Sequence, residues 1–186
     1  MTQATIIRYT SMAIGLHWLT AALIIAAFGL GWTLADMEFS LQKLRWLSWH
    51  KWLGITLLGL TALRLGWRLT HPAPPLPATL PVWQQWAAHA VHLLLYGLLF
   101  AIPLSGWLFS SAKGIPVVYL GVLPLPDLIS ANEAVAGGLR TLHAVLNYAL
   151  LAAVGAHVGA ALKHHFIERD TVLARMLPIV RRRGNN

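Results

Sequence analysis

The sequence contains no cysteine and few charged residues. Without cysteine there are no disulfides, no thiolate-bound iron–sulfur clusters and no C-x-x-C-H attachment of a cofactor, so a bound metal would need histidine, methionine, tyrosine or carboxylate ligands. Charged residues make up 11% of the chain, against roughly 25% in soluble domains, and hydrophobic residues make up 57%. So few charges cannot cover a surface exposed to water, and we therefore expect an integral membrane protein.

The basic residues do not indicate binding to nucleic acid. The formal net charge is +8, but the Lys and Arg residues lie at the ends of long apolar segments. Membrane topology accounts for that placement better than a nucleic-acid surface does. We expect a lipid bilayer as partner and no nucleic acid.

Four apolar stretches are long enough to cross a hydrocarbon core about 30 Å thick, which takes about 20 helical residues. They predict an all-α integral membrane four-helix bundle, a single domain over residues 1–186, because runs this long do not suit barrel strands. The first stretch is also too long for the apolar region of a cleaved signal peptide. The expected spans are residues 12–35, 49–69, 82–111 and 139–166.

Counts of Lys and Arg predict the orientation, because cytoplasmic loops carry more of them. The side with the two termini and the Pro-rich loop at residues 71–81 has nine, and the opposite side has five. Both termini are therefore expected in the cytoplasm. The nine are Arg8, Arg64, Arg68, Lys163, Arg169, Arg175, Arg181, Arg182 and Arg183, and the five are Lys43, Arg45, Lys51, Lys113 and Arg140.

Two histidines of the fourth expected span are placed to hold two groups at different depths. His143 and His157 are 14 residues apart, which in an α-helix means about 21 Å of rise and about 40° short of whole turns. They share one helix face and lie near opposite membrane surfaces. A single polar patch does not need this separation, whereas two cofactors stacked along the membrane normal do.

Each of these histidines needs a partner at its own depth. His17 lies near the inner start of the first span, and His50 lies near the outer start of the second. Depth therefore pairs His17 with His157 (inner) and His50 with His143 (outer), which suits two low-spin, electron-transferring haem b groups with iron held by two imidazoles each. The alternatives are hydrogen bonds between helices, or a non-haem metal, which usually takes three or four protein ligands.

Other polar residues near these positions are candidates for contacts with a quinone or with haem propionates. They are His89, His92, His164, Arg64 and Arg68 on the inner side, and Lys51 and Arg140 on the outer side. Interfacial snorkelling or positive-inside anchoring would also explain them. Gly54, Gly155 and Gly159 would let a flat macrocycle approach a helix, although helix packing explains glycines equally well. No residue is assigned a catalytic role.

Several segments resemble the bacterial cytochrome b561 family over about residues 7–178. The segments are RYTSMAIGLHWL with His17, WHKWLGI with His50, AAHAVHLLLY with His89 and His92, and LHAVLNYALLAAVGAHVGAALKHHFIERDTVLARMLP with His143, His157, His164 and His165. The resemblance implies a multi-pass dihaem cytochrome of the bacterial inner membrane whose haem ligands match His17, His50, His143 and His157. It further implies electron exchange with ubiquinone or another quinone and, in some members, oxidation of periplasmic superoxide.

Three functions remain open. The first is a quinone-linked oxidoreductase that works alone, taking electrons from a small-molecule or protein donor, with superoxide as one candidate. Lys51, Lys113 and Arg140 would offer that anion a cationic approach. The second is a haem-bearing anchor subunit of a periplasmic dehydrogenase or hydrogenase, whose cytochrome b subunits have a similar helix arrangement. The third is a haem-free transporter or scaffold with polar contacts between helices.

Overall fold

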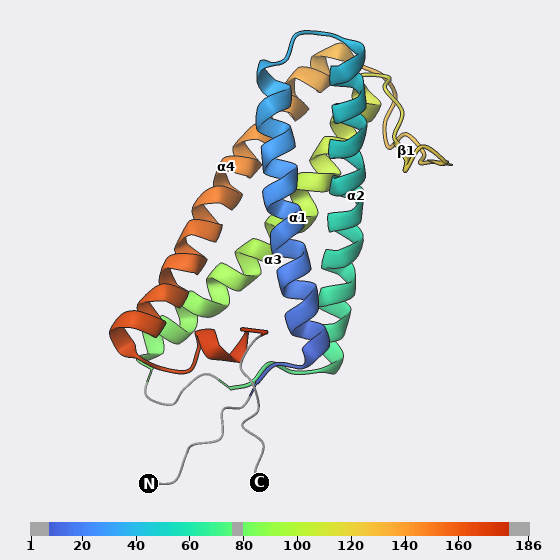
Figure 1. Ribbon diagram of the computed structural model, residues 1–186. Helices are drawn as coiled ribbons and strands as arrows, with labels where there is room; N and C mark the ends of the chain where they lie inside the picture. The colour runs from blue at the N-terminus through green and yellow to red at the C-terminus, as the bar shows by residue number, and fades with distance from the viewer. Residues whose placement is uncertain (1–7, 76–79, 179–186) are drawn as a thin grey trace, which may run out of the picture.

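A computed structural model describes residues 8–75 and 80–178 of the chain. Within these ranges the chain forms four long α-helices, and successive helices run in opposite directions (Figure 1). The helices are α1 (Ser11–Asp36), α2 (Leu41–Thr70), α3 (Val82–Ala112) and α4 (Glu133–Lys163). The expected all-α bundle is confirmed. Of the basic residues counted for orientation, Arg181, Arg182 and Arg183 lie outside the described residues.

Polar side chains cap the starts of three helices. The Thr10 hydroxyl accepts a hydrogen bond from the Ala13 amide before α1, and the Ser40 hydroxyl does the same for Lys43 before α2. The Asn132 side chain caps α4. Such caps satisfy amide groups that have no partner within the helix. They explain why α2 and α4 begin well before the apolar runs from which the spans were expected.

The helix α2 is the most polar of the four. In the part of the chain that the structure describes, α1, α3 and the segment from α4 to residue 168 are long and apolar enough to cross a membrane by composition alone. The basic residues of α2 lie toward its two ends, and residues 52–63 carry no charge. The helix α2 nevertheless packs as a member of the bundle, because it contacts both α1 and α3.

The bundle surface is strongly apolar. Ile25, Trp32, Leu93 and Tyr148 are each at least two-thirds exposed. Contiguous apolar exposure on this scale is rare in soluble monomers and suits hydrocarbon. Interior hydroxyl groups bond within their own helices, as Thr20 does to the Leu16 carbonyl at 2.7 Å, which satisfies a polar group that lipid could not.

A short hairpin marks one end of the bundle, which we name the hairpin end. Its strands β1 (Val118–Tyr119) and β2 (Leu123–Pro124) pair antiparallel. The turn between them needs left-handed backbone at Leu120 (φ 53°) and Gly121 (φ 75°). The Trp52 indole of α2 donates to the Val118 carbonyl at 2.7 Å, so the hairpin is fastened to the side of the bundle.

The opposite end carries a five-residue π-helix, η1 (His164–Glu168), and a 3-10 turn, η2 (Leu173–Arg175), after α4. We name it the π-helix end. The guanidinium of Arg8 bonds to the Leu177 carbonyl, and the Trp18 indole donates to the Met176 carbonyl at 2.8 Å. The two extremities of the described chain therefore meet at this end of the bundle.

Candidate functional site

One pair of histidines faces inward near the hairpin end. His50 of α2 and His143 of α4 have ring centroids 6.3 Å apart and ring planes at 83° to one another. His50 lies more than two turns inside α2, because that helix begins at Leu41. The two histidines expected to pair at the outer depth are therefore neighbours in the structure.

A second pair lies nearer the π-helix end. His17 of α1 and His157 of α4 have ring centroids 6.1 Å apart, with planes at 64°. His92 of α3 also points here, with its ring centroid 5.4 Å from that of His157. The sequence placed His92 near the inner site only as a candidate for quinone or propionate contacts. Its approach to His157 gives this end three imidazoles rather than two.

Both pairs have the separation that a shared metal requires. A metal held between two axial imidazoles, with metal–nitrogen distances of about 2 Å, separates the ring centroids by roughly 6 Å. The observed values of 6.3 and 6.1 Å match this separation. Two imidazoles in direct contact through a hydrogen bond would lie closer. The residues therefore fit a haem iron at each level of the bundle.

The hydrogen bonds at the hairpin end indicate which ring nitrogen of His50 and of His143 is free to bind a metal. Nδ1 of His50 lies 3.1 Å from the Ala27 carbonyl, and Nδ1 of His143 lies 3.1 Å from the Ile102 carbonyl and 2.9 Å from the hydroxyl of Ser105. A carbonyl oxygen only accepts, so Nδ1 must carry the proton in both rings. A neutral imidazole then has its free lone pair on Nε2, the arrangement of a metal ligand with a fixed partner behind it.

The glycines that were expected to leave room for a macrocycle do stand beside open space. A Cβ atom added at Gly54, Gly155 or Gly159 would meet no atom within 4 Å. Gly54 is one turn beyond His50, and Gly155 and Gly159 flank His157. The other helical glycines of the described residues, apart from Gly31 and Gly106, also have no atom within 4 Å, so this space is compatible with a macrocycle but does not distinguish it from the open surface of the bundle.

At the π-helix end, Nδ1 of His17 has a different kind of hydrogen-bond partner. The guanidinium of Arg64 on α2 lies 3.0 Å from Nδ1 of His17. A guanidinium only donates, so here Nδ1 accepts, and in the neutral ring the proton lies on Nε2. Arg64 also stacks on the ring of Tyr96, 5.6 Å from its centroid. Arg64, Arg68 and Tyr96 line one small cavity.

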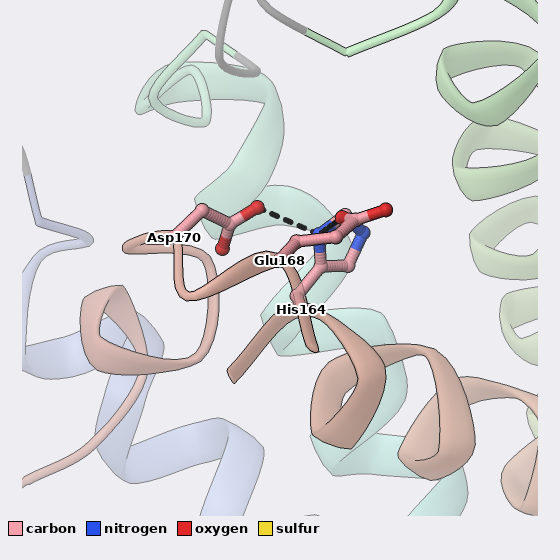
Figure 2. A group of neighbouring side chains, drawn as sticks. All are labelled: His164, Glu168 and Asp170. Atoms are coloured by element: carbon pink, nitrogen blue, oxygen red, sulfur yellow. Dashed lines mark hydrogen bonds and ion pairs between the residues drawn. The ribbon is translucent and has the colours of Figure 1, made fainter. Parts of the chain in front are cut away.

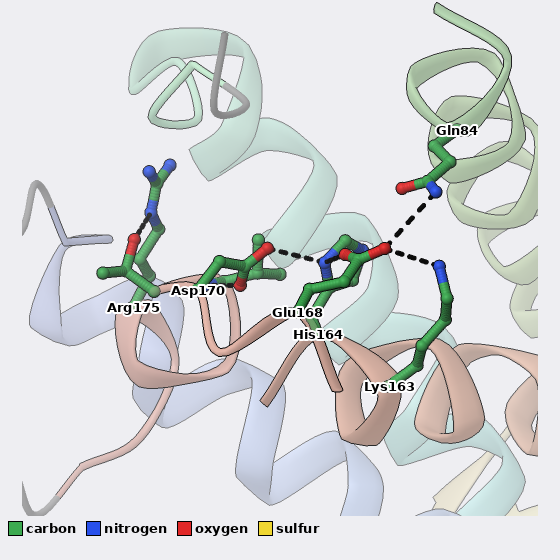
Figure 3. A network of polar contacts seen from close by, with 8 residues as sticks. Gln84, Lys163, His164, Glu168, Asp170 and Arg175 are labelled. Carbon is green, nitrogen blue, oxygen red and sulfur yellow. Dashed lines mark hydrogen bonds and ion pairs between the residues drawn. The ribbon is translucent and has the colours of Figure 1, made fainter. Parts of the chain in front are cut away.

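A polar cluster lies beyond the end of α4, on the π-helix (Figure 2). Nδ1 of His164 is 2.5 Å from a carboxylate oxygen of Glu168 and 2.7 Å from one of Asp170. Lys163 and Gln84 hold the other oxygen of Glu168, and the Val172 amide holds the other oxygen of Asp170 (Figure 3).

The His164 side chain is only 15% exposed. The ligand atoms of His164, Glu168 and Asp170 lie within 4.8 Å of one another, a spacing that a divalent ion could use. Hydrogen bonds and ion pairs among the three side chains satisfy the same atoms without a metal. The cluster therefore gathers polar groups beside the end of the bundle.

The remaining candidates point elsewhere. Nδ1 of His89 lies 2.6 Å from the Gln85 carbonyl of its own helix. The ammonium of Lys51 donates to the carbonyls of Ile115 and Pro116, at 3.2 and 3.3 Å, and so holds the loop before the hairpin. Arg140 is exposed, three residues before His143. These three side chains are not gathered around either histidine pair by the contacts described.

Sequence reasoning missed the groups behind the ligands at the hairpin end. Ser105 is 3% exposed and bonds both to His143 and, at 2.8 Å, to the Ile102 carbonyl. Gly31 and Gly106 stand against the rings of His50 and His143. One available signal was a glycine followed by tryptophan, which occurs at residues 31–32 and 106–107 but also at residues 66–67, where no ring lies against the glycine.

Comparison with known proteins identifies relatives along nearly the whole chain. "Cytochrome b561 homolog 2" of Escherichia coli is 37% identical over 172 residues, 91% of each chain. "Cytochrome b561 homolog 1" of the same organism is 32% identical over 179 residues, covering 92% of this chain and 97% of the relative. A protein of Yersinia pestis named as a probable superoxide oxidase is 29% identical over 178 residues, covering 92% and 96%.

The family model agrees with these relatives and with the geometry. The model described as prokaryotic cytochrome b561 matches residues 8–178, a range that contains all four paired histidines. A family of cytochromes b carries b-type haem, and the helices suit a bacterial membrane. The chain therefore belongs to the prokaryotic cytochrome b561 family, as a membrane-embedded electron-transfer protein that carries b-type haem.

Proposed function

We propose that this protein is a dihaem cytochrome that carries electrons across the bacterial inner membrane, from a periplasmic donor to the quinone pool. The observation that carries the proposal is the pair of imidazole separations, 6.3 Å for His50 with His143 and 6.1 Å for His17 with His157. His143 and His157 are about 21 Å apart along α4. With one haem at each level, an electron would cross the membrane in shorter, separate transfers.

The four histidines hold the cofactors, and the surrounding residues set their environment. Haem, when bound, supplies reversible one-electron transfer. At the hairpin end the carbonyls of Ala27 and Ile102 orient the two ligand rings through Nδ1. At the π-helix end His17 would hold the haem through Nε2, and Arg64, which now lies against Nδ1 of His17, would be available to pair with a propionate.

We place the quinone at the π-helix end, which the charge asymmetry assigns to the cytoplasmic side. Reduction of a quinone takes two electrons and two protons, so this site needs a proton source. The cluster of His164, Glu168 and Asp170 lies at this end and offers polar groups for a path from the water to a quinone. Arg68 and His92 lie on the neighbouring helices and supply donors for quinone oxygens.

Superoxide is the donor that we propose for the opposite end, following the printed name of the Yersinia relative. In this reaction two superoxide anions give one electron each and leave as dioxygen, and one quinone takes both electrons with two protons to become a quinol. Electrostatic steering is weaker than the charges alone suggest, because Lys113 forms an ion pair with Glu133 and the ammonium of Lys51 binds loop carbonyls. Arg140 is the exposed cation nearest to His143 in sequence.

The test begins with the haem content of the purified, full-length protein. We expect two b-type haems per chain in the reduced-minus-oxidised visible spectrum and in a haem-to-protein ratio. His17→Ala and His157→Ala should each remove the same haem, and His50→Ala and His143→Ala should each remove the other. His165→Ala is the matched control on the same segment as His157, because its ring contacts Phe166 rather than a ligand pair, and this variant should retain both haems.

Three results would contradict the proposal. A ratio of one haem or less in the wild-type protein would remove the dihaem assignment. Loss of the same haem from all four histidine variants would remove the pairing. Failure of superoxide generated in solution to reduce a soluble quinone through the two-haem protein would remove the proposed donor while leaving the cytochrome in place.

A second candidate function has its own support in the hairpin. Leu120, Val122 and Leu123 are 55%, 81% and 53% exposed at the tip, and an exposed apolar tip that projects from the side of the bundle suits a docking contact with a periplasmic subunit. In that case the same haems would serve a dehydrogenase or hydrogenase partner. Purification in mild detergent distinguishes the two functions, because a lone chain with superoxide–quinone activity excludes a required partner.

A further inference from the structure

The two acceptor carbonyls at the hairpin end share a position relative to a glycine. His50 bonds to the carbonyl of Ala27, four residues before Gly31, and His143 bonds to the carbonyl of Ile102, four residues before Gly106. The two cases occur on different helices, α1 and α3. The repetition on independent elements argues that the glycine is part of the arrangement.

Helix geometry explains why the residue four positions later matters. The carbonyl of residue i points along the axis toward the amide of residue i+4, and the Cβ of each residue tilts back toward the helix N-terminus. The Cβ of residue i+4 therefore covers the approach to the carbonyl of residue i. A ring from a neighbouring helix can bond to that oxygen sideways only if the covering side chain is absent.

The clearances at the two glycines agree with this geometry. A Cβ at Gly31 would lie 3.2 Å from Cε1 of His50, and a Cβ at Gly106 would lie 3.1 Å from Cε1 and 3.4 Å from Nδ1 of His143. These distances are shorter than ordinary carbon contacts of about 3.5–4.0 Å. Among the helical glycines of the described residues, Gly31 and Gly106 are the two for which such a Cβ would meet another atom within 4 Å.

We propose that Gly31 and Gly106 are positioning residues for the haem at the hairpin end. By lacking a Cβ, they let His50 and His143 seat their Nδ1–H groups on main-chain carbonyls, which fixes each ring plane and leaves Nε2 for the iron. This inference rests on the proposed dihaem function. Because a donated Nδ1–H makes the imidazole a stronger electron donor, the same contact stabilises ferric iron and holds the reduction potential down.

The test compares Gly31→Ala and Gly106→Ala with two matched controls, Gly29→Ala on α1 and Gly97→Ala on α3. A Cβ at either control position would meet no atom within 4 Å. In the haem-loaded, full-length protein, each positioning variant must displace its ring by a few tenths of an ångström. We expect the potential of the hairpin-end haem to shift to more positive values and the largest g-value of its ferric EPR signal to change.

The haem at the π-helix end serves as an internal reference, because no positioning glycine touches His17 or His157. Its potential and EPR signal should stay as in the wild type, and both controls should match the wild type at both haems. Loss of the hairpin-end haem alone from Gly31→Ala or Gly106→Ala also supports the proposal.

Unchanged signals in both positioning variants would overturn the inference, and so would equal changes in the controls. Loss of both haems from a positioning variant would overturn it too, because a contact limited to His50 or His143 cannot act on the other site. A wild-type protein with fewer than two haems would instead count against the proposed function. The haem content of the wild-type protein therefore distinguishes a failure of the proposed function from a failure of this inference.

Discussion

His17 and His50 are expected to do the same chemistry, yet their Nδ1 atoms face opposite kinds of partner. Nδ1 of His50 donates to the Ala27 carbonyl, whereas Nδ1 of His17 accepts from the guanidinium of Arg64. A carbonyl behind a ligand increases its electron donation, and a cation near a haem favours the reduced, more electron-rich state. At the scale of single residues, we therefore expect the two proposed haems to differ in reduction potential, with the one at the π-helix end the more easily reduced.

Replacing Arg64 should make the haem at the π-helix end harder to reduce. For Arg64→Leu, removal of one positive charge at roughly 8 Å in a medium of effective dielectric about 20 changes the free energy of reduction by about 2 kcal/mol. For one electron this corresponds to a downward shift of roughly 90 mV. Redox titration followed in the visible spectrum measures it.

The conservative variant Arg64→Lys keeps the charge and should hold the potential near the wild-type value. The haem at the hairpin end should not move in either variant. An equal shift in Arg64→Lys would show that the shape of the guanidinium, rather than its charge, sets the potential.

The proximity of the histidines in two pairs could be predicted at the residue scale, but the groups behind their rings could not. Depth in the membrane follows from position along an apolar run, and this was enough to match His50 with His143 and His17 with His157. Which main-chain carbonyl lies behind a ring depends on the rotation of each helix about its axis, which composition does not determine. The position of His92 could not be predicted for the same reason, because its distance from His157 depends on the rotation of α3 about its axis.

Among the elements, α4 has a special place because it contributes one ligand to each pair. The α-helical register between His143 and His157 therefore couples the two sites. The partner histidines come from different helices, α2 for His143 and α1 for His157.

A single alanine inserted after Tyr148 should separate the two sites. It rotates one half of α4 relative to the other by about 100° and shifts it by about 1.5 Å, so His143 and His157 can no longer both face their partners. Tyr148 itself is 69% exposed, but the shifted half carries the core residues Leu150 and Ala153, so helix content by circular dichroism is measured alongside. We expect at most one haem per chain, measured from the haem-to-protein ratio.

An alanine inserted after Ser130 controls for insertion as such, because Ser130 is exposed and lies in the loop before α4. This variant should keep two haems. Retention of both haems by the Tyr148 insertion would mean that the register of α4 does not link the sites.

Element boundaries were harder to predict than element number. The helix α2 begins at Leu41 because Ser40 caps it, whereas the apolar pattern from which the span was expected begins only near Trp49. The π-helix η1 arises where α4 ends in a sequence rich in polar groups, and Arg169 then leaves the helix with φ 53°. Neither the start of α2 nor the π-helix is indicated by a periodic pattern of apolar residues.

On the scale of the whole molecule, the charge asymmetry and the bundle ends give a testable topology. The π-helix end is expected in the cytoplasm and the hairpin end in the periplasm, because the former carries more Lys and Arg. The chain has no native cysteine, so a single introduced cysteine reports the accessibility of one position without background.

We expect Val122→Cys, at the exposed tip of the hairpin, to react with a membrane-impermeant maleimide in intact spheroplasts. Pro72→Cys, an exposed position at the π-helix end, should react only after the membrane is opened. Both variants should label fully in detergent, which serves as the accessibility control. Labelling of Pro72→Cys from outside, with Val122→Cys protected, would reverse the orientation and the direction of the proposed electron path.

The acceptors behind His50 and His143 belong to the main chain, and this has an evolutionary consequence. Every amino acid carries a carbonyl, so no point mutation at Ala27 or Ile102 can delete the acceptor, whereas one codon change deletes the guanidinium of Arg64. Natural variation should therefore retune the cofactor on the Arg64 side far more readily. A lineage that switches to a quinone of different redox character can adapt there without disturbing the electron entry on the other face of the membrane.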